Sequence, residues 1–167
     1  MQRALSFRSA LLKAGGCRFT LSLTADYGEY AADFTISCVC TADGAARFTL
    51  QQPQTLEGVC GTAGPGTPEL EFDDVRVALP ALSGGVAPLR APYLLCASWT
   101  EGFLESAEQT QEGLLVRIRY GYEDEALEIE TLLSAEEAAP VRAEIARGGK
   151  TVLFAHVSDF SWGSEAA

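Results

Sequence analysis

The sequence predicts a mainly β (α+β) protein, in which a curved antiparallel half-barrel of about eleven strands carries helices on its concave face. Apolar and polar residues alternate along most of the chain, which is typical of strands with one buried face. Two segments break this alternation and have helical character instead. The chain has 167 residues, 47% hydrophobic and 21% charged, and this size and composition suit one globular core. We therefore expect residues 1–167 to form a single domain.

The first helix is predicted over residues 2–14. Ala4, Phe7 and Leu11 lie on one helical stripe, while arginine and lysine residues occupy much of the remaining surface. Gly15 follows directly, and glycine tolerates the left-handed conformation that is common just after a helix. The pattern therefore predicts an amphipathic helix that ends at Gly15.

A second helix is predicted between Pro92 and Gly102. Proline suits a first helical turn and glycine suits a C-terminal stop, and the residues from Tyr93 to Trp99 are apolar nearly all round. Such a helix must be buried or must face an apolar partner. Leu95 and Trp99 are four residues apart and share a helix face. We therefore expect the Trp99 ring to point into the concave side of the sheet.

The alternating runs predict the strands, and turn residues separate them. The Asp43-Gly44 pair marks a hairpin. Residues 61–68 are rich in glycine, proline and threonine, so we expect a mobile loop there. The predicted strands cover residues 19–26, 32–40, 46–51, 56–61, 69–73, 75–80, 105–112, 114–122, 127–133, 141–145 and 151–157.

The acidic composition excludes several classes of partner. A formal net charge of −11 repels phosphate backbones and anionic lipid headgroups, so neither nucleic acid nor membrane attachment through a basic patch is expected. No stretch reaches the ~20 apolar residues that a membrane-spanning helix needs. Arg8 and Lys13 interrupt the N-terminal segment, so we expect no signal peptide within it.

The five cysteines do not form a recognisable metal motif. They include no CxxC pair, and the sequence has a single histidine, so we expect no structural zinc site. Cys38 and Cys40 alternate along one strand and therefore share a face, ~6.5–7 Å apart, which is too far for a comfortable disulfide. We interpret them as small buried hydrophobic residues, with a soft-metal CxC site as the alternative. The five are Cys17, Cys38, Cys40, Cys60 and Cys96.

Other residue groups suggest chemistry but lack its geometry. His156, Ser158 and Asp159 come from one short run, where neighbouring strand side chains point in opposite directions, so a catalytic triad is not expected. Glu69, Glu71, Asp73 and Asp74 suggest a cation site, and the first three share a predicted strand face. They lack the glycine and the ligand spacing of a calcium loop, and we interpret them as a solvated outer face. We therefore expect no catalytic residues, no metal and no cofactor.

Several sequence segments resemble a known superfamily. The segments that carry the resemblance are FTLSLTADYG, ADFTISC, RFTLQQPQTLEG, LEFDDVRVAL and APYLL. In these segments, and in its order of helix, meander, apolar helix and meander, the chain resembles the LolA/LolB-like lipoprotein superfamily, in particular exported LolA-like lipoproteins of Gram-positive bacteria. The resemblance implies a half-barrel that encloses an apolar cavity. No ligand-binding residue of the lipoprotein carriers matches a position in this sequence.

The candidate ligand site consists of apolar residues on the predicted concave face and the central helix. This helix can serve as a plug that fills the half-barrel or as a lid over a cavity, and the sequence leaves both open. The candidate residues are Phe34, Ile36, Phe48, Leu50, Tyr93, Leu95, Trp99, Val116 and Ile118.

The resemblance, together with the apolar residues of the sheet and central helix, implies a non-catalytic cell-envelope lipoprotein domain that binds a lipid or another hydrophobic small molecule between sheet and helices. The alternative is a closed-core structural or protein-interaction module at the cell surface. We expect a monomer on the extracellular face of the membrane, held by a lipid anchor that lies outside residues 1–167. If no export signal precedes Met1, the protein is instead expected in the cytoplasm.

Overall fold

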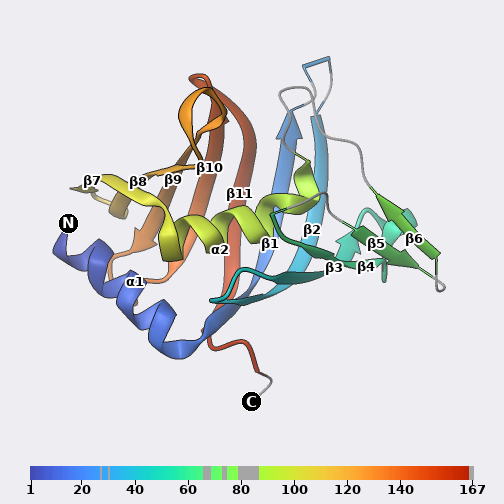
Figure 1. The fold of residues 1–167 in the computed structure, drawn as a ribbon, viewed down its shortest axis with the longest axis horizontal. Helices are drawn as coiled ribbons and strands as arrows, with labels where there is room; N and C mark the ends of the chain where they lie inside the picture. Colours follow the sequence, from blue (N-terminus) through green and yellow to red (C-terminus); the bar gives the residue numbers. More distant parts are fainter. Residues whose placement is uncertain (27, 30, 66–68, 73–74, 79–86, 166–167) are drawn as a thin grey trace.

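The computed structural model describes residues 1–26, 28–29, 31–65, 69–72, 75–78 and 87–165. Within these residues the protein is mainly β, with one open, curved antiparallel sheet and two α-helices, α1 (Gln2–Ala14) and α2 (Ala91–Glu101), which confirms the predicted class (Figure 1). The strands are β1 (Gly16–Asp26), β2 (Ala31–Thr41), β3 (Ala46–Gln52), β4 (Cys60–Ala63), β5 (Glu69–Phe72), β6 (Val75–Ala78), β7 (Phe103–Gln109), β8 (Gly113–Tyr120), β9 (Leu127–Ser134), β10 (Pro140–Arg147) and β11 (Lys150–Trp162).

Two meanders meet in the middle of this sheet. The strand order is β6-β5-β4-β3-β2-β1-β11-β10-β9-β8-β7, so the first and last strands pair with each other. Strands β6 and β7 consequently lie at opposite edges. Because α2 lies in the connection between them, the chain must cross the whole sheet at this point. Figure 1 shows α2 running across the concave face, and it contacts β1, β2, β3 and β8.

The ends of both helices follow from their sequences. Gly15 caps α1 in the left-handed conformation, at φ 75°, as predicted. Proline lies in the first turn of α2, and Gly102 ends it. A side chain at Gly102 would clash with the Ile118 side chain and the Ser98 carbonyl oxygen. Glycine therefore ends α2 and also permits the close approach of this turn to β8.

Several predicted strands need correction. The strand expected over 56–61 is instead a short 3-10 helix (Gln54–Leu56) and a turn, in which the Val59 N–H donates to the Leu56 carbonyl. Strand β4 begins only at Cys60, so residues 61–63 of the expected loop are paired with β3. The strand expected over 105–112 is β7, two to three residues earlier. The expected run 114–122 ends at Tyr120, because Gly121 has a φ of 103°, and Tyr122 is exposed.

Some predictions fall outside the described part of the chain. Alternation predicts that Leu70 and Phe72 on β5 and Val75 and Val77 on β6 point inward. The structure describes both strands as backbone without side chains, so these positions stay predictions. The same holds for Leu79, for the solvated face assigned to Glu69, Glu71, Asp73 and Asp74, and for the last residues of the expected loop, 66–68.

Candidate functional site

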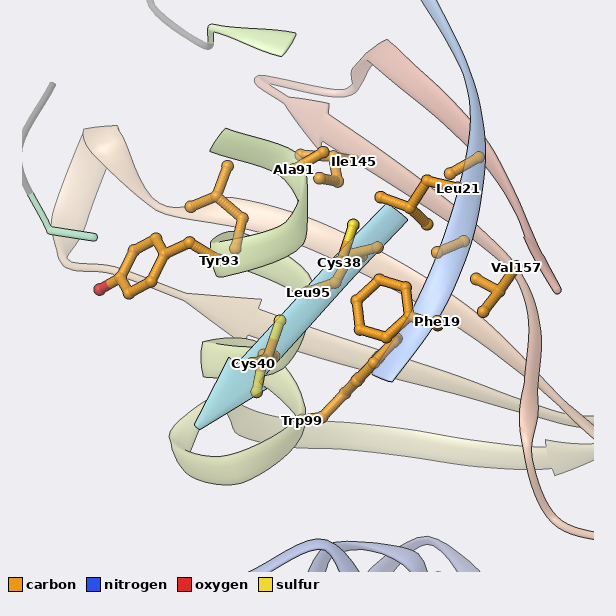
Figure 2. Close-up of a cluster of buried hydrophobic side chains, with 14 of the residues drawn as sticks. Phe19, Leu21, Cys38, Cys40, Ala91, Tyr93, Leu95, Trp99, Ile145 and Val157 are labelled. Atoms are coloured by element: carbon orange, nitrogen blue, oxygen red, sulfur yellow. The ribbon is translucent and has the colours of Figure 1, made fainter. Parts of the chain in front are cut away.

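The predicted ligand residues belong to one apolar core, part of which is drawn in Figure 2. Eight of the nine are buried, and Phe34 on β2 is partly buried and packs against the others. They come from β2, β3, α2 and β8, which the fold brings together on the concave side. The structure therefore places these residues in a packed core.

A small void lies between the two helices and strands β7 to β9, and we call it the inner void. Its volume is about 10 Å³, which is at the lower limit for one water molecule. Three of the predicted residues line it, namely Trp99, Val116 and Ile118. Sequence reasoning missed the other lining residues, which are Ala4, Phe7, Leu104, Thr131 and Leu133.

Two features of the sequence indicate three of the missed residues, namely Ala4, Phe7 and Thr131. Ala4 and Phe7 lie on the apolar stripe of α1 and are buried as that stripe predicts. Thr131 occupies an inward position between Ile129 and Leu133, and all three are buried. A hydroxyl at an otherwise apolar inward position indicates a buried polar partner. Its partner lies on α2, and the strand pattern alone does not identify it.

Trp99 is that partner and the centre of the site. Its Nε1–H donates to Oγ1 of Thr131 at 2.9 Å, and its side chain is 1% exposed. The ring packs edge-on against Phe7 at a centroid distance of 5.9 Å and, in a tilted arrangement, against Phe19 at 5.5 Å. The indole is thus held by α1, β1 and β9 together, and its polar atom is satisfied inside the core.

The structure answers the question of plug or lid for α2. Every residue from Ala91 to Trp99 is buried. The helix therefore fills the half-barrel and acts as a plug. At its edge, the Tyr93 and Tyr120 hydroxyls lie 2.9 Å apart, and the Tyr120 hydroxyl donates to Glu101 at 3.1 Å. Burial and these two hydrogen-bond partners raise the pKa of Tyr120, so this tyrosine stays protonated at neutral pH.

Helix α1 is attached differently. Only Ala4, Phe7 and Leu11 of α1 are buried. The Arg8 guanidinium donates to three carbonyl oxygens at the C-terminal end of α2: Trp99 at 2.8 Å, Ser98 at 3.2 Å and Gly102 at 2.6 Å.

These three carbonyls lie where α2 ends and helical N–H partners run out, although that of Ser98 also accepts from the Gly102 N–H. A cation there adds hydrogen bonds and also interacts favourably with the helix dipole. Partial burial lowers the pKa of Arg8, but an arginine remains charged. A second arginine, Arg3, donates to the Gln109 side chain at 2.9 Å. Polar contacts thus contribute much of the attachment of α1.

The cysteines are placed as the alternation predicted. Cys38 and Cys40 share the inner face of β2 and are buried, and burial raises the pKa of the Cys38 thiol. The Cys40 thiol donates to the Pro92 carbonyl at 3.5 Å. The neighbouring Cys17 and Cys96 thiols, together with burial, raise the pKa of Cys40 well above the usual value. Among the described residues, no group of three potential ligands has the arrangement of a metal site. Cys60 is exposed.

His156, Ser158 and Asp159 do not converge. All three are exposed on β11, and the His156 ring packs edge-on against Phe154 at 5.2 Å. Asp159 has a left-handed backbone conformation, with φ 52°. The described part of the chain also holds no helix of the length and apolarity that crossing a membrane requires.

Comparison with known proteins gives a fold likeness. No family model and no curated protein matches the sequence. Among solved structures, a putative outer membrane lipoprotein-sorting protein domain from Vibrio parahaemolyticus is similar at 8% identity and a TM-score of 0.53, covering 99% of this chain and 93% of that one.

A LolA superfamily protein from Nitrosomonas europaea is similar at 11% identity and a TM-score of 0.52, covering 96% and 94% of the two chains. The narrower likeness to Gram-positive lipoproteins finds no support in these structures. At the level of the fold, the predicted resemblance is confirmed, and the chain has the LolA-like fold.

Proposed function

We propose that the protein is a non-catalytic cell-envelope domain that binds a lipid or another hydrophobic molecule between α1 and the sheet. The observation that carries the proposal is the inner void. Seven of its eight lining residues are apolar, and the single hydroxyl, on Thr131, is already occupied by Trp99. An acyl chain in this space would meet apolar surface and would leave no polar group newly unpaired.

The void is too small for a lipid in the closed structure, so binding requires that one wall moves. Helix α1 is the wall that can move at least cost, because it buries three side chains, whereas α2 is buried along most of its length. Displacing Ala4 and Phe7 would open the void toward Leu104 on the edge strand β7. In this proposal α1 is the lid and α2 the fixed floor of the binding site.

The fold likeness supports the same reading. One of the similar structures is described as a lipoprotein-sorting domain, and a helix-covered, curved sheet suits the shielding of an acyl chain from water. We further propose that residues 1–167 act as one domain, as a monomer, on the extracellular face of the membrane. Attachment would be through a lipid anchor outside these residues, and no nucleic acid is expected as partner.

The proposal is tested by titrating the protein with palmitate. The sequence has two tryptophans, so a Trp162→Phe variant leaves Trp99 as the only reporter, directly in the wall of the void. We expect a saturable change in Trp99 emission at about one palmitate per chain, together with a palmitate adduct in native mass spectra. Absence of both, at concentrations below the aggregation limit of the fatty acid, would rule the proposal out.

A variant pair tests whether α1 is the lid. Arg8→Gln removes the cation that holds α1 to α2 and should raise the population of the open state. Apparent affinity rises in proportion to that population, so we expect palmitate to bind severalfold more tightly. Arg119→Gln is the matched control, because Arg119 is an exposed arginine that pairs with Glu105 at 3.4 Å, on the outer face of the sheet. It should leave binding unchanged.

A second candidate function is a closed-core structural or protein-interaction module at the cell surface. The observation that favours it is the size of the inner void, about 10 Å³, since a core this well filled resembles an ordinary protein interior. In that case neither the wild type nor Arg8→Gln binds palmitate, and Arg8→Gln only lowers the stability.

A further inference from the structure

The outer face of the sheet carries a separate hollow of about 690 Å³, in the other half of the sheet from the inner void. It lies over β1 to β4 and the end of β11, and we call it the outer hollow. Its walls are the outward-facing side chains of these strands, whereas the inward-facing ones form the core. The outward-facing lining residues are Arg18, Thr20, Ser37, Val39, Arg47, Thr49, Cys60, Thr62, Asp159 and Ser161.

Strand register places two arginines in one row across the outer hollow. Arg18 on β1 is the Cα partner of Val39 on β2, and Val39 is the partner of Arg47 on β3. Neighbouring strands are ~4.8 Å apart, so the two arginine backbones lie about 10 Å apart. The two guanidiniums can therefore flank one small group above Val39.

A row of hydroxyl groups runs beside the arginines. Thr20, Ser37 and Thr49 are successive partners across β1, β2 and β3, and they lie two residues along each strand from the arginine row. Two residues of strand span about 7 Å. The floor of the outer hollow thus offers two cations and three hydroxyls within the dimensions of a small phosphorylated molecule.

The charges of the outer hollow differ from those elsewhere on this face. Arg117, Arg119 and Arg142 each pair with a glutamate. Among the described residues, Arg18 and Arg47 make no ion pair, and Asp159 is the single acidic residue in the lining. On a chain of net charge −11, two arginines in a hollow that form no ion pair with the described residues make a local positive site that the overall charge conceals.

We propose that the outer hollow binds a phosphate group, held between Arg18 and Arg47 and hydrogen-bonded by the neighbouring hydroxyls. Guanidinium groups match the geometry of phosphate oxygens and bind them through two parallel hydrogen bonds. The hydroxyls of Thr20, Ser37 and Thr49 can donate to the remaining oxygens or to the polar group that carries the phosphate. The same chemistry fits a soluble phosphate ester and a phospholipid headgroup.

Replacement of Asp159 tests this proposal, because it is expected to raise the affinity for phosphate. A carboxylate in the lining repels an anion, so Asp159→Asn should strengthen phosphate binding. Asn tolerates the left-handed backbone that Asp159 adopts, at φ 52°. The variant is therefore expected to fold normally, and a tighter complex would report on the charge in the hollow.

The experiment is calorimetric titration of the full chain with inorganic phosphate and with glycerol phosphate, at low ionic strength. We expect binding that weakens about tenfold or more in Arg18→Gln and in Arg47→Gln, and that tightens severalfold in Asp159→Asn. Arg142→Gln, on the same face but paired with Glu112 at 3.6 Å, is the charge-matched control and should bind like the wild type. Thermal unfolding of each variant confirms that it is folded.

Vesicles distinguish the two sources of the phosphate. Vesicles of phosphatidylcholine with added phosphatidylglycerol are mixed with the wild type and with Arg18→Gln. Binding of vesicles that is lost in the variant indicates a headgroup, whereas binding of glycerol phosphate alone indicates a soluble ester. The proposal fails if the wild type binds none of these ligands, or if Arg142→Gln weakens binding as much as Arg18→Gln does.

Discussion

The two helices are held against the same concave face in opposite ways. Helix α2 is apolar nearly all round and is buried from Ala91 to Trp99, while α1 buries only Ala4, Phe7 and Leu11. Helix α2 is fixed by the topology, since it joins strands at opposite edges of the sheet. Helix α1 runs directly into β1, and its polar contacts with the rest of the fold include the hydrogen bonds of Arg3 and Arg8. The difference indicates that a helix-filled half-barrel can still have one movable wall.

The largest expected effect concerns the fixed helix. Trp99→Ala removes the most deeply packed ring of α2 and leaves Oγ1 of Thr131 without its donor. Large-to-small changes of this kind in a core cost ~3–5 kcal/mol. We therefore expect the free energy of unfolding, measured by urea denaturation, to fall by about that amount. A loss below ~1 kcal/mol would show that α2 is not the plug.

The corresponding change on α1 should cost less. Phe7→Ala removes a ring that is as central to the inner void, where it packs against Trp99 at 5.9 Å. If α1 can detach while the sheet stays folded, the loss cannot exceed the free energy that docks this helix, which we expect to be about 2 kcal/mol. Urea denaturation measures the loss of stability in Phe7→Ala and in Trp99→Ala. Equal losses would mean that α1 is an integral part of the core.

Loss of the hydrogen bond inside the core should cost less than Trp99→Ala and about as much as Phe7→Ala. Thr131→Val keeps the shape of the side chain but leaves the Trp99 Nε1–H unsatisfied, which costs ~1–3 kcal/mol. The same denaturation experiment measures it. Ser22→Val is a matched control, because Ser22 lies at an outward, exposed position of β1, and it should change the stability by less than ~0.5 kcal/mol. Equal effects at the two positions would contradict the buried bond.

The smallest effect comes from the outer side of α1. Leu12 is 49% exposed and Leu11 is fully buried, although the two are neighbours in the sequence. Leu12→Ala should change the free energy of unfolding by less than ~0.5 kcal/mol, and Leu11→Ala should lower it by ~2 kcal/mol. Thermal or urea unfolding of both variants measures these losses. A larger loss of stability in Leu12→Ala than in Leu11→Ala would show that the buried face of α1 is assigned wrongly.

Alternation along the chain was sufficient to predict which side chains enter the core. Phe19 and Leu21 on β1, and Ile36 on β2, are all buried because a strand has only two faces. The predicted strand boundaries differ from those in the structure where glycine and proline interrupt the pattern. Strand β4, for example, begins only after the turn at Gly58, which has a φ of 86°.

Neither site could be predicted in full from the sequence, because each depends on contacts between residues that are distant in the sequence. The inner void requires that Phe7 docks beside Thr131, and no local pattern indicates this pairing. The outer hollow requires the register that sets Arg18, Val39 and Arg47 in one row. Alternation places these side chains on a common face, but only strand pairing shows which of them are neighbours.

The central claim is that α1 is a lid and α2 a fixed floor, and hydrogen exchange followed by mass spectrometry tests it most directly. Without ligand, the backbone amides of α1 should exchange markedly faster than those of α2, since local opening frees α1 alone. Palmitate should change the exchange of α1 and of the edge strand β7, and leave α2 protected. Equal protection of the two helices, unaltered by palmitate, would contradict the account.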